Sequence, residues 1–345
     1  MSRETNQPTN QLTNQPTKEL AALAVTKKTL SNSENVNKSG KPRTMWGDVW
    51  RKLSQNLPAM MGLTIVVGMY LTALIAPLLV TQAYDEINLD IAADGPQPPS
   101  IDHLLGTDEL GRDIWSRVIW ASRSAAFVSI FVPSIGLVLG LFFGSMAGYF
   151  SGWIDTIIMR VVDILFAFPG LLFIIFLAAT LKPVVIEWAK NAGMQELIRQ
   201  GYVDYIVIFG ALGLVGWGGM ARIVRGLFLS LRTQEFVLAA RAIGLPQWRI
   251  ALKHVLPNTL PTVIVLISGG IGGTIAAEAT LSFLGIGLQP PNPSWGGMLS
   301  DYIGYYRHPD YWILSLLPAV ILIIIILAFT FVGDGLYEAL NPYLD

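Results

Sequence analysis

The sequence contains six continuous apolar runs, each about as long as a helix that crosses a lipid bilayer. They lie at 60–80, 125–150, 156–181, 202–220, 262–283 and 311–332. Because the bilayer interior offers no water, the backbone of such a run must satisfy its own hydrogen bonds. The runs are continuous rather than alternating, which predicts helices and not a β-barrel. We therefore expect an all-α integral membrane protein with six transmembrane helices.

Composition agrees with this expectation. Of the 345 residues, 52% are hydrophobic and 14% are charged, and the mean hydropathy of +0.52 is too high for an ordinary soluble domain. Cysteine is absent, which excludes disulfides, thiolate metal sites and cysteine nucleophiles. The formal net charge of -1 gives no reason to expect a nucleic-acid partner, so membrane lipid is the expected surrounding.

The first part of the chain has two sections. Residues 1–44 repeat the pattern T-N-Q-P and then become rich in Lys, Ser and Asn, which predicts a disordered tail, with a docking role as the alternative. The first apolar run begins too late and is too long for a cleavable signal peptide. Residues 45–80 are expected to form a short interfacial lead-in, with Trp46 and Trp50 at headgroup level, and the first transmembrane helix.

Charge between the runs predicts orientation. Residues 81–124 carry eight acids and three arginines, so we place this segment outside the cell. Residues 222–257 carry six cations and one acid beside two spans, which places them in the cytoplasm by the positive-inside rule. Both termini are then cytoplasmic: the core covers 125–338, and 339–345 form the C-terminus. Residues 182–203 are expected to form an outer helix.

The segment 222–257 is expected to form an elbow of two short helices. Thr233 can cap the first helix, 233–243, which Gly244 and Pro246 end. Its apolar positions follow helical spacing: Phe236, Ala239, Ala240 and Ile243. The second repeats this spacing at Trp248, Ala251, Leu252 and Val255, and Pro257 with Pro261 is expected to close it. Such a pair could lie on lipid, but the small residues Ala239, Ala240 and Gly244 favour a protein partner.

Three of the charged residues inside the expected spans are candidate functional residues. Arg160 and Asp163 are one helical turn apart, and they predict either a structural ion pair or a role in gating or the pathway. Glu278 is either a functional carboxylate or one capped by its surroundings.

Glycine is frequent in the same spans. Gly136, Gly140, Gly144 and Gly148 recur at every fourth position, which favours close helix packing. The run G-G-I-G-G at 269–273 suits a pathway wall or a tight interface.

Signals for catalysis are missing from the sequence. The phosphate-loop pattern G-x-x-x-x-G-K-[ST] has no match, so the chain is not expected to hydrolyse ATP. His103, His254 and His308 do not fall at a metal-ligand spacing and are interpreted as loop or surface residues. We expect no catalytic residues, no metal site and no cofactor.

Four separated segments resemble one family. Leu238-Ala239-Ala240, Gly244 and Leu256-Pro257 stand at the spacing of the cytoplasmic loop motif of importer-type ABC permeases, although Leu238 replaces the usual Glu. The segments 106–117 (G-T-D-E-L-G-R-D-I-W-S-R), 282–299 and 333–342 are similar to those of the peptide and nickel branch.

The resemblance implies a type I ABC importer permease fold in the cytoplasmic (inner) membrane. The implied partners are a second, nonidentical permease, two ATP-binding subunits and an extracytoplasmic solute-binding protein. The implied cargo is a di- or oligopeptide, with nickel or another small solute as the alternative. A remote alternative for the function itself is an ion-coupled secondary transporter. ATPase coupling is expected at Glu235, Phe236, Ala239, Ala240, Arg241 and Gly244, and the pathway at Glu278, Arg160 and Asp163.

Overall fold

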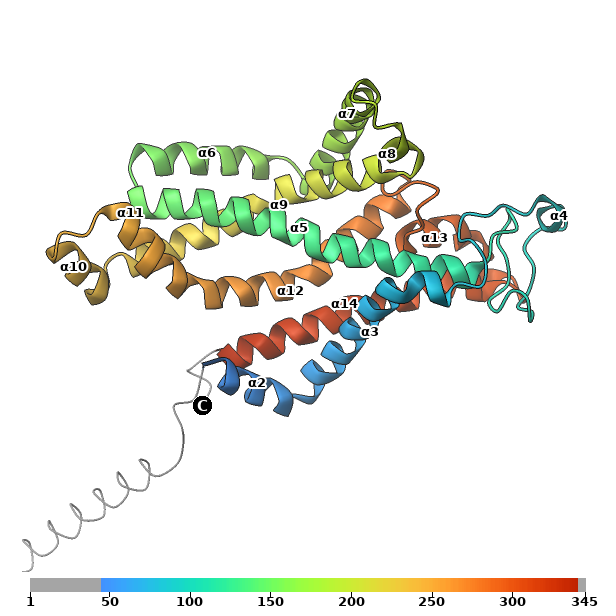
Figure 1. The fold of residues 1–345 in the computed structure, drawn as a ribbon, viewed down its shortest axis with the longest axis horizontal. Coiled ribbons are helices and arrows are strands. Elements are labelled where there is room, and N and C mark those ends of the chain that lie inside the picture. Colours follow the sequence, from blue (N-terminus) through green and yellow to red (C-terminus); the bar gives the residue numbers. More distant parts are fainter. Residues whose placement is uncertain (1–44, 341–345) are drawn as a thin grey trace, which may run out of the picture. The chain divides into compact units, whose positions relative to one another are not determined.

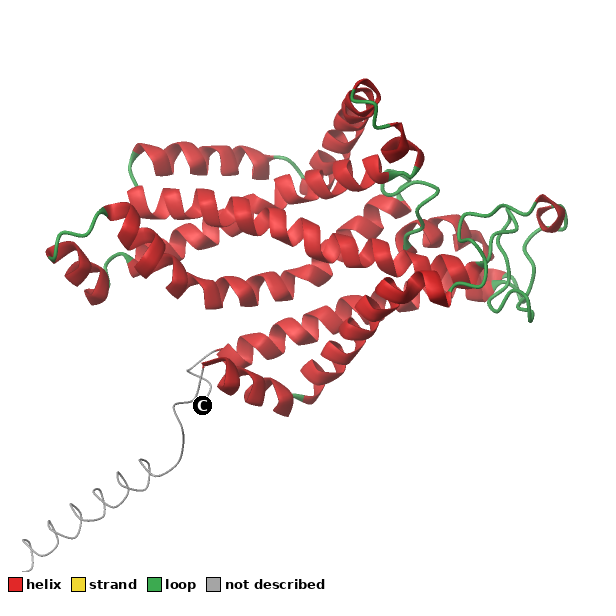
Figure 2. Cartoon of the chain, in the orientation of Figure 1, coloured by secondary structure: helices red, strands yellow, loops and turns green. Residues whose placement is uncertain are grey.

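The structure, a computed structural model, describes residues 45–340, so the expected tail at 1–44 and residues 341–345 lie outside the described residues. The chain divides into two units, Met1–Asp48 and Val49–Asp345, and the second contains all the expected spans. The described residues form helices and no named strand, which confirms the all-α class (Figures 1 and 2).

The α-helices are α2 (Met45–Gln55), α3 (Leu57–Leu79), α4 (Leu89–Ala92), α5 (Ile114–Phe150), α6 (Trp153–Ala167), α7 (Gly170–Asn191), α8 (Gln195–Arg199), α9 (Tyr202–Leu231), α10 (Glu235–Ala242), α11 (Gln247–Ile250), α12 (Leu256–Phe283), α13 (Trp295–Tyr302) and α14 (Trp312–Leu340). A π-helix, η1 (Ala251–Val255), joins α11 to α12, and a 3₁₀-helix, η2 (Ile303–Arg307), follows α13.

Six helices among the described residues are long and apolar enough to cross a membrane, as expected. They are Leu57–Leu79, Ile114–Phe150, Gly170–Asn191, Tyr202–Leu231, Gln247–Phe283 and Trp312–Leu340. Several of them extend well into segments that composition had assigned to loops, and α5 and α9 are two of these. α5 begins at Ile114 because the Asp113 carboxylate caps it, accepting a hydrogen bond from the Ser116 backbone N–H at 2.8 Å. α9 continues to Leu231, so the elbow proper is shorter than 222–257.

The expected third span, 156–181, is not one helix. The chain leaves helical geometry at Phe168, whose backbone is extended (φ −95°, ψ 144°), and restarts at Gly170. Pro169 explains the break, because a proline disfavours the helical region for the residue before it. Figure 1 shows α6 alongside α5, whereas α7 leaves in a different direction. Arg160 and Asp163 therefore lie on the 15-residue α6, which is shorter than a spanning helix.

The expected outer helix at 182–203 was also wrong in extent. Its first half continues α7 to Asn191, with Pro183 inside the helix, and only the short α8 stands apart. The apolar pattern of α7 extends past the charged Lys182 and Glu187, which composition alone had taken as the end of the span.

Close packing of α5 on α9 organises the core. At Gly144 an added Cβ would lie 2.6 Å from the Ala221 carbonyl oxygen, and at Gly148 it would lie 2.7 Å from that of Arg225. Such approach is possible only without a side chain, which agrees with the packing interpretation of the glycine row. The first member, Gly136, is different, because nothing lies within 3.9 Å of its Cβ position.

Gly144→Ala should lower the thermal unfolding midpoint of the detergent-solubilised protein, because the new methyl group must push α9 away. We expect a loss of about 1–3 kcal/mol of stability. Gly136→Ala is the matched control on the same helix, and it should be neutral or slightly stabilising, since alanine favours helix. Equal midpoints for the two variants would contradict the packing argument.

Candidate functional site

The elbow begins with α10, and its end was predicted correctly. Gly244 adopts a left-handed conformation (φ +79°), its N–H donates to the Arg241 carbonyl at 2.9 Å, and the Leu245 N–H donates to the Ala240 carbonyl at 3.2 Å. This pair of bonds is a Schellman cap, which glycine favours because it has no Cβ. The predicted N-cap was wrong: Gln234 occupies it, and Thr233 instead donates its hydroxyl to the Ser230 carbonyl.

The second arm of the elbow does not end at Pro257 and Pro261, as had been expected. α11, η1 and α12 run on as one helical segment, Gln247–Phe283. A proline is tolerated in the first turn of a helix, and Pro257 lies at the start of α12. The π-turn rearranges the bonding there, and the Asn258 amide donates to the His254 carbonyl at 2.6 Å. The elbow is therefore joined directly to a membrane-spanning helix.

Burial divides the elbow into two faces. Val237, Ala240, Ile250 and Val255 are buried in a cluster with residues of α5 and α9. The opposite face, which we call the elbow surface, is exposed and consists of Glu235, Phe236, Leu238, Ala239, Arg241, Ile243, Gly244, Trp248 and Leu252.

The elbow surface is unusually apolar for exposed residues. Ile243 is 78% exposed, and Trp248 is 56% exposed. Large exposed apolar patches mark interaction sites. Five of the six expected coupling residues lie on this surface, but Ala240 does not, since it is only 5% exposed and supports α10 from inside.

The arginines before the elbow pair with acids on α6. Arg225 donates two hydrogen bonds to Asp155, at 2.5 and 2.6 Å. Arg222 donates to Asp163 at 3.0 Å, so the expected Arg160–Asp163 pair was wrong. The sequence could not rank these partners, because Arg222 comes from another helix. The two pairs hold α6 on α9, while Arg160 is exposed.

Glu278 is buried near the other end of α12, with 3% of its surface exposed. The Ser282 hydroxyl donates to its carboxylate at 2.6 Å, and the Leu288 backbone N–H donates to that hydroxyl at 3.0 Å. No ion pair to a described cation is present. The carboxylate is thus linked through the Ser282 hydroxyl to the turn after α12, which fits the capped interpretation better than solute contact.

A cavity of about 340 Å³, which we call the central cavity, lies between α5, α7, α9 and α12. Its lining is apolar or small and carries no charge, and Thr274 supplies one hydroxyl. The glycines of the 269–273 run lie in two environments, a helix contact and the cavity lining. Gly272 approaches the Ile326 carbonyl of α14, whereas Gly270 and Gly273 line the cavity. The tight-interface alternative therefore holds at Gly272, while the pathway-wall alternative for Gly270 and Gly273 stays a prediction.

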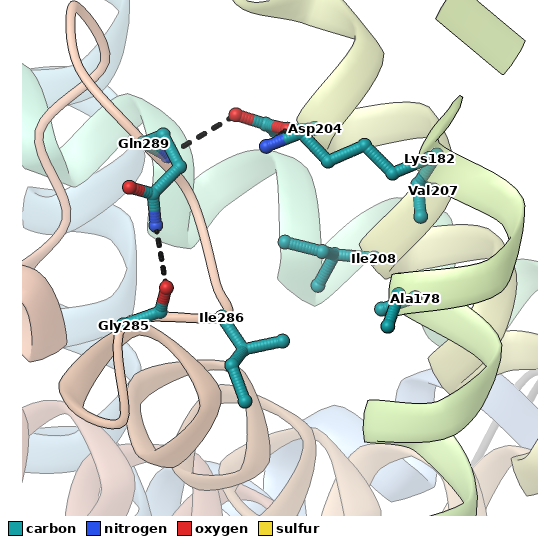
Figure 3. A pocket seen from close by; sticks show the side chains of 9 residues that line it. Ala178, Lys182, Asp204, Val207, Ile208, Gly285, Ile286 and Gln289 are labelled. Atoms are coloured by element: carbon teal, nitrogen blue, oxygen red, sulfur yellow. Dashed lines mark hydrogen bonds and ion pairs between the residues drawn. The ribbon is translucent and has the colours of Figure 1, made fainter.

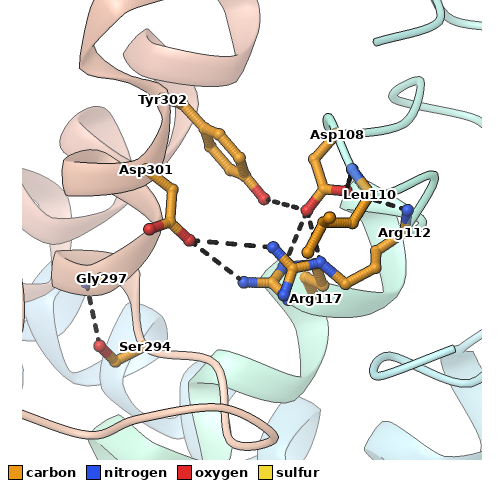
Figure 4. Close-up of polar contacts among 8 residues, drawn as sticks. All are labelled: Asp108, Leu110, Arg112, Arg117, Ser294, Gly297, Asp301 and Tyr302. Carbon is orange, nitrogen blue, oxygen red and sulfur yellow. Dashed lines mark hydrogen bonds and ion pairs between the residues drawn. The ribbon is translucent and has the colours of Figure 1, made fainter. Parts of the chain in front are cut away.

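A polar cluster ties the 106–117 segment to α13 (Figure 4). Asp108 accepts hydrogen bonds from Arg112 Nε at 2.7 Å and from the Tyr302 hydroxyl at 3.0 Å. Arg117 Nη2 lies 3.6 Å from Asp301. Burial raises the pKa of the Tyr302 phenol, so it stays a donor. Local pairing of Asp and Arg was predictable, but Tyr302 and Asp301 were not, since they are almost 200 residues away.

A second cavity, of about 300 Å³ and partly polar, lies where α7 meets α9 and the turn after α12 (Figure 3). Lys182 Nζ lies 2.6 Å from Asp204 Oδ1, and the Gln289 backbone N–H donates to the same carboxylate at 3.3 Å. Ala178, Val207, Ile208 and Ile286 complete the lining. These contacts anchor α7 to α9 and to the turn after α12.

Possible metal-ligating side chains are dispersed in the described part of the chain. No group of three His, Cys, Asp or Glu side chains there could hold a metal ion. His103 is a loop residue, but it is buried and lies 3.1 Å from Asp113, so it belongs to the cap of α5.

Comparison with known proteins agrees with the fold. Residues 140–345 match the family described as "binding-protein-dependent transport system inner membrane component", and residues 44–99 match the "N-terminal TM domain of oligopeptide transport permease C".

Several curated relatives align over most of the chain. A dipeptide transport system permease protein, DppC, of Bacillus subtilis is 38% identical over 302 residues, covering 86% of this chain and 85% of that one. An oligopeptide transport system permease protein, OppC, of Bacillus subtilis is 36% identical, covering 91% and 94%. A glutathione transport system permease protein, GsiD, of Pectobacterium atrosepticum is 34% identical, covering 88% and 92%. The chain therefore belongs to the family of inner-membrane permease components of binding-protein-dependent transport systems.

Proposed function

We propose that this chain is the membrane-spanning permease subunit of an ATP-driven importer of di- and oligopeptides. The observation that carries the proposal is the continuous helix from the elbow surface to the central cavity. Trp248 lies at one end of the segment Gln247–Phe283, and Gly270 and Gly273 line the cavity within it. A partner that moves the elbow therefore moves the cavity wall.

Coupling would occur on the elbow surface. α10 seats in a groove of an ATP-binding subunit, with Phe236, Ala239 and Gly244 in contact and Glu235 and Arg241 beside them. Closure of two such subunits on ATP displaces the elbow, and α12 transmits the displacement, so that the central cavity opens to alternate sides. Ala240 acts indirectly, by fixing α10 on the chain's own core.

The proposed assembly contains a second, nonidentical permease, two ATP-binding subunits and an extracytoplasmic solute-binding protein. Support for another membrane partner comes from α7, of whose spanning window only 11% is buried within the chain. Its exposed apolar residues include Leu171, Leu172, Phe176, Val184 and Trp188. Both termini are proposed to be cytoplasmic, because the cations of the elbow region favour that side.

The peptide class is proposed from two observations. Related permeases are named for dipeptides, oligopeptides and glutathione, which are all peptides. The central cavity lining carries neither carboxylate nor imidazole, which are ligands that a nickel pathway would use. Ion-coupled transport is disfavoured because Glu278 is bound to Ser282 and is not part of the cavity lining.

Deletion of the chain should abolish uptake of a labelled dipeptide, a labelled tetrapeptide or both, and the intact chain should restore it. Nickel uptake serves as the control and should not change. Loss of nickel uptake alone would replace the proposed cargo, and unchanged uptake of all three would contradict the peptide assignment.

Ala239→Glu should reduce uptake about tenfold or more, because a charge on the elbow surface opposes docking, and about 1.4 kcal/mol of lost affinity is a factor of ten. The protein should still reach the membrane with a normal unfolding midpoint. Co-purification of the ATP-binding subunit is the direct readout, and it should fall in parallel.

Two matched substitutions give this test its controls. Ala240→Glu buries a carboxylate in the core cluster, so it should lower the unfolding midpoint itself. Ala192→Glu places the same charge on an exposed residue at the end of α7 and should leave uptake normal. Normal co-purification with Ala239→Glu would contradict coupling through the elbow surface.

A further inference from the structure

We infer that α5 and α9 form a binding site for a glycerophospholipid, whose acyl chain fills an aromatic pocket and whose phosphate pairs with Arg123. The inference is independent of the proposed cargo and of ATP coupling. It requires only that the two helices cross the membrane.

The pocket has a volume of about 450 Å³, which is within the range of ligand pockets. Two helical rows form it, each with a spacing of four residues. The α5 row is Phe127, Phe131 and Ile135, and the α9 row is Tyr202, Ile206 and Gly210, with Tyr205 and Phe209 between the rows. Apart from two phenol hydroxyls, the lining side chains are apolar, so the pocket suits a hydrocarbon chain.

The pocket is separate from the central cavity, because the two share no lining residue. On α5, which lines both, Phe131 of the pocket and Gly136 of the cavity point about 140° apart, since an α-helix turns about 100° per residue. Phe131 is 52% exposed and Ile206 is 51% exposed. A pocket on the outer face of two spanning helices is surrounded by lipid rather than by the transported solute.

A cation lies at one end of the pocket. Arg123 precedes Phe127 by one turn of α5, and its guanidinium lies 4.5 Å from the centre of the Trp120 ring. The Tyr84 ring also stacks on the Trp120 ring, and the two ring centres are 4.3 Å apart.

Arg123 has no acid partner among the described residues, whereas Arg112, Arg117, Arg222 and Arg225 each lie within ion-pair distance of one. A half-buried guanidinium above an apolar pocket, bordered by tyrosine and tryptophan, is complementary to a phosphate at the membrane interface. A helix of another permease could also cover the pocket, but an apolar helix would leave the Arg123 charge unpaired.

The test uses the full-length chain with its co-expressed subunits in proteoliposomes that contain phosphatidylglycerol with a photoactivatable diazirine in one acyl chain. We expect crosslinks in 127–135 and 202–210. Gly210→Leu should fill the pocket without a clash, since nothing lies within 4 Å of its Cβ position, and should remove most of the labelling. Gly226→Leu, equally open and on the same helix, is the control and should label normally.

A second arm tests the headgroup. Arg123→Gln should weaken phosphatidylglycerol labelling about fivefold, as expected for one cation at the membrane surface, and Arg123→Lys should retain most of it. Labelling by a diacylglycerol with the same diazirine chain should not depend on residue 123. Equal labelling of the Gly210→Leu and Gly226→Leu variants, or lipid labelling of another subunit with none in 127–135 and 202–210, would overturn the inference.

Discussion

The rest of the structure depends on how closely α5 and α9 approach. Both helices cross the membrane, where lipid is as apolar as their side chains, so no hydrophobic effect drives the two helices together. Close contact stabilises the pair instead, and the glycines from Gly140 to Gly148 permit it. This rigid pair carries the central cavity on one side and the aromatic pocket on another, and α10 rests on its end.

Mechanical continuity distinguishes the elbow from an ordinary loop. A loop that ended at Pro257 could move without moving the membrane core. The π-turn and the Asn258 side chain instead continue the helix past the prolines, so α11, η1 and α12 form one helical segment. Only the short turn after the cap at Gly244 separates this segment from α10. The buried face of α10 holds it in place, which leaves the apolar elbow surface free for a partner.

The ionic contacts form two separate groups, and each group joins different elements. The Asp155 and Asp163 pairs join α6 to α9 beside the elbow, whereas the Asp108 and Asp301 contacts join the 106–117 segment to α13 at the opposite end. Neither set lies in the central cavity. The lining of the central cavity therefore consists of small and apolar groups, while the ionic contacts fix the elements around it.

The sequence by itself determined the number of spans, the stop at Gly244 and the family, because these depend on apolar run length, on backbone conformation and on local spacing. It also contained the break at Phe168–Pro169, a local signal that the length of the apolar run concealed. Only the tertiary structure decided that Asp163 pairs with Arg222, that Ala240 faces inward and that Glu278 is held by Ser282 under a turn. Each of these depends on which helices meet and at which rotation, and spacing along one chain segment does not define either.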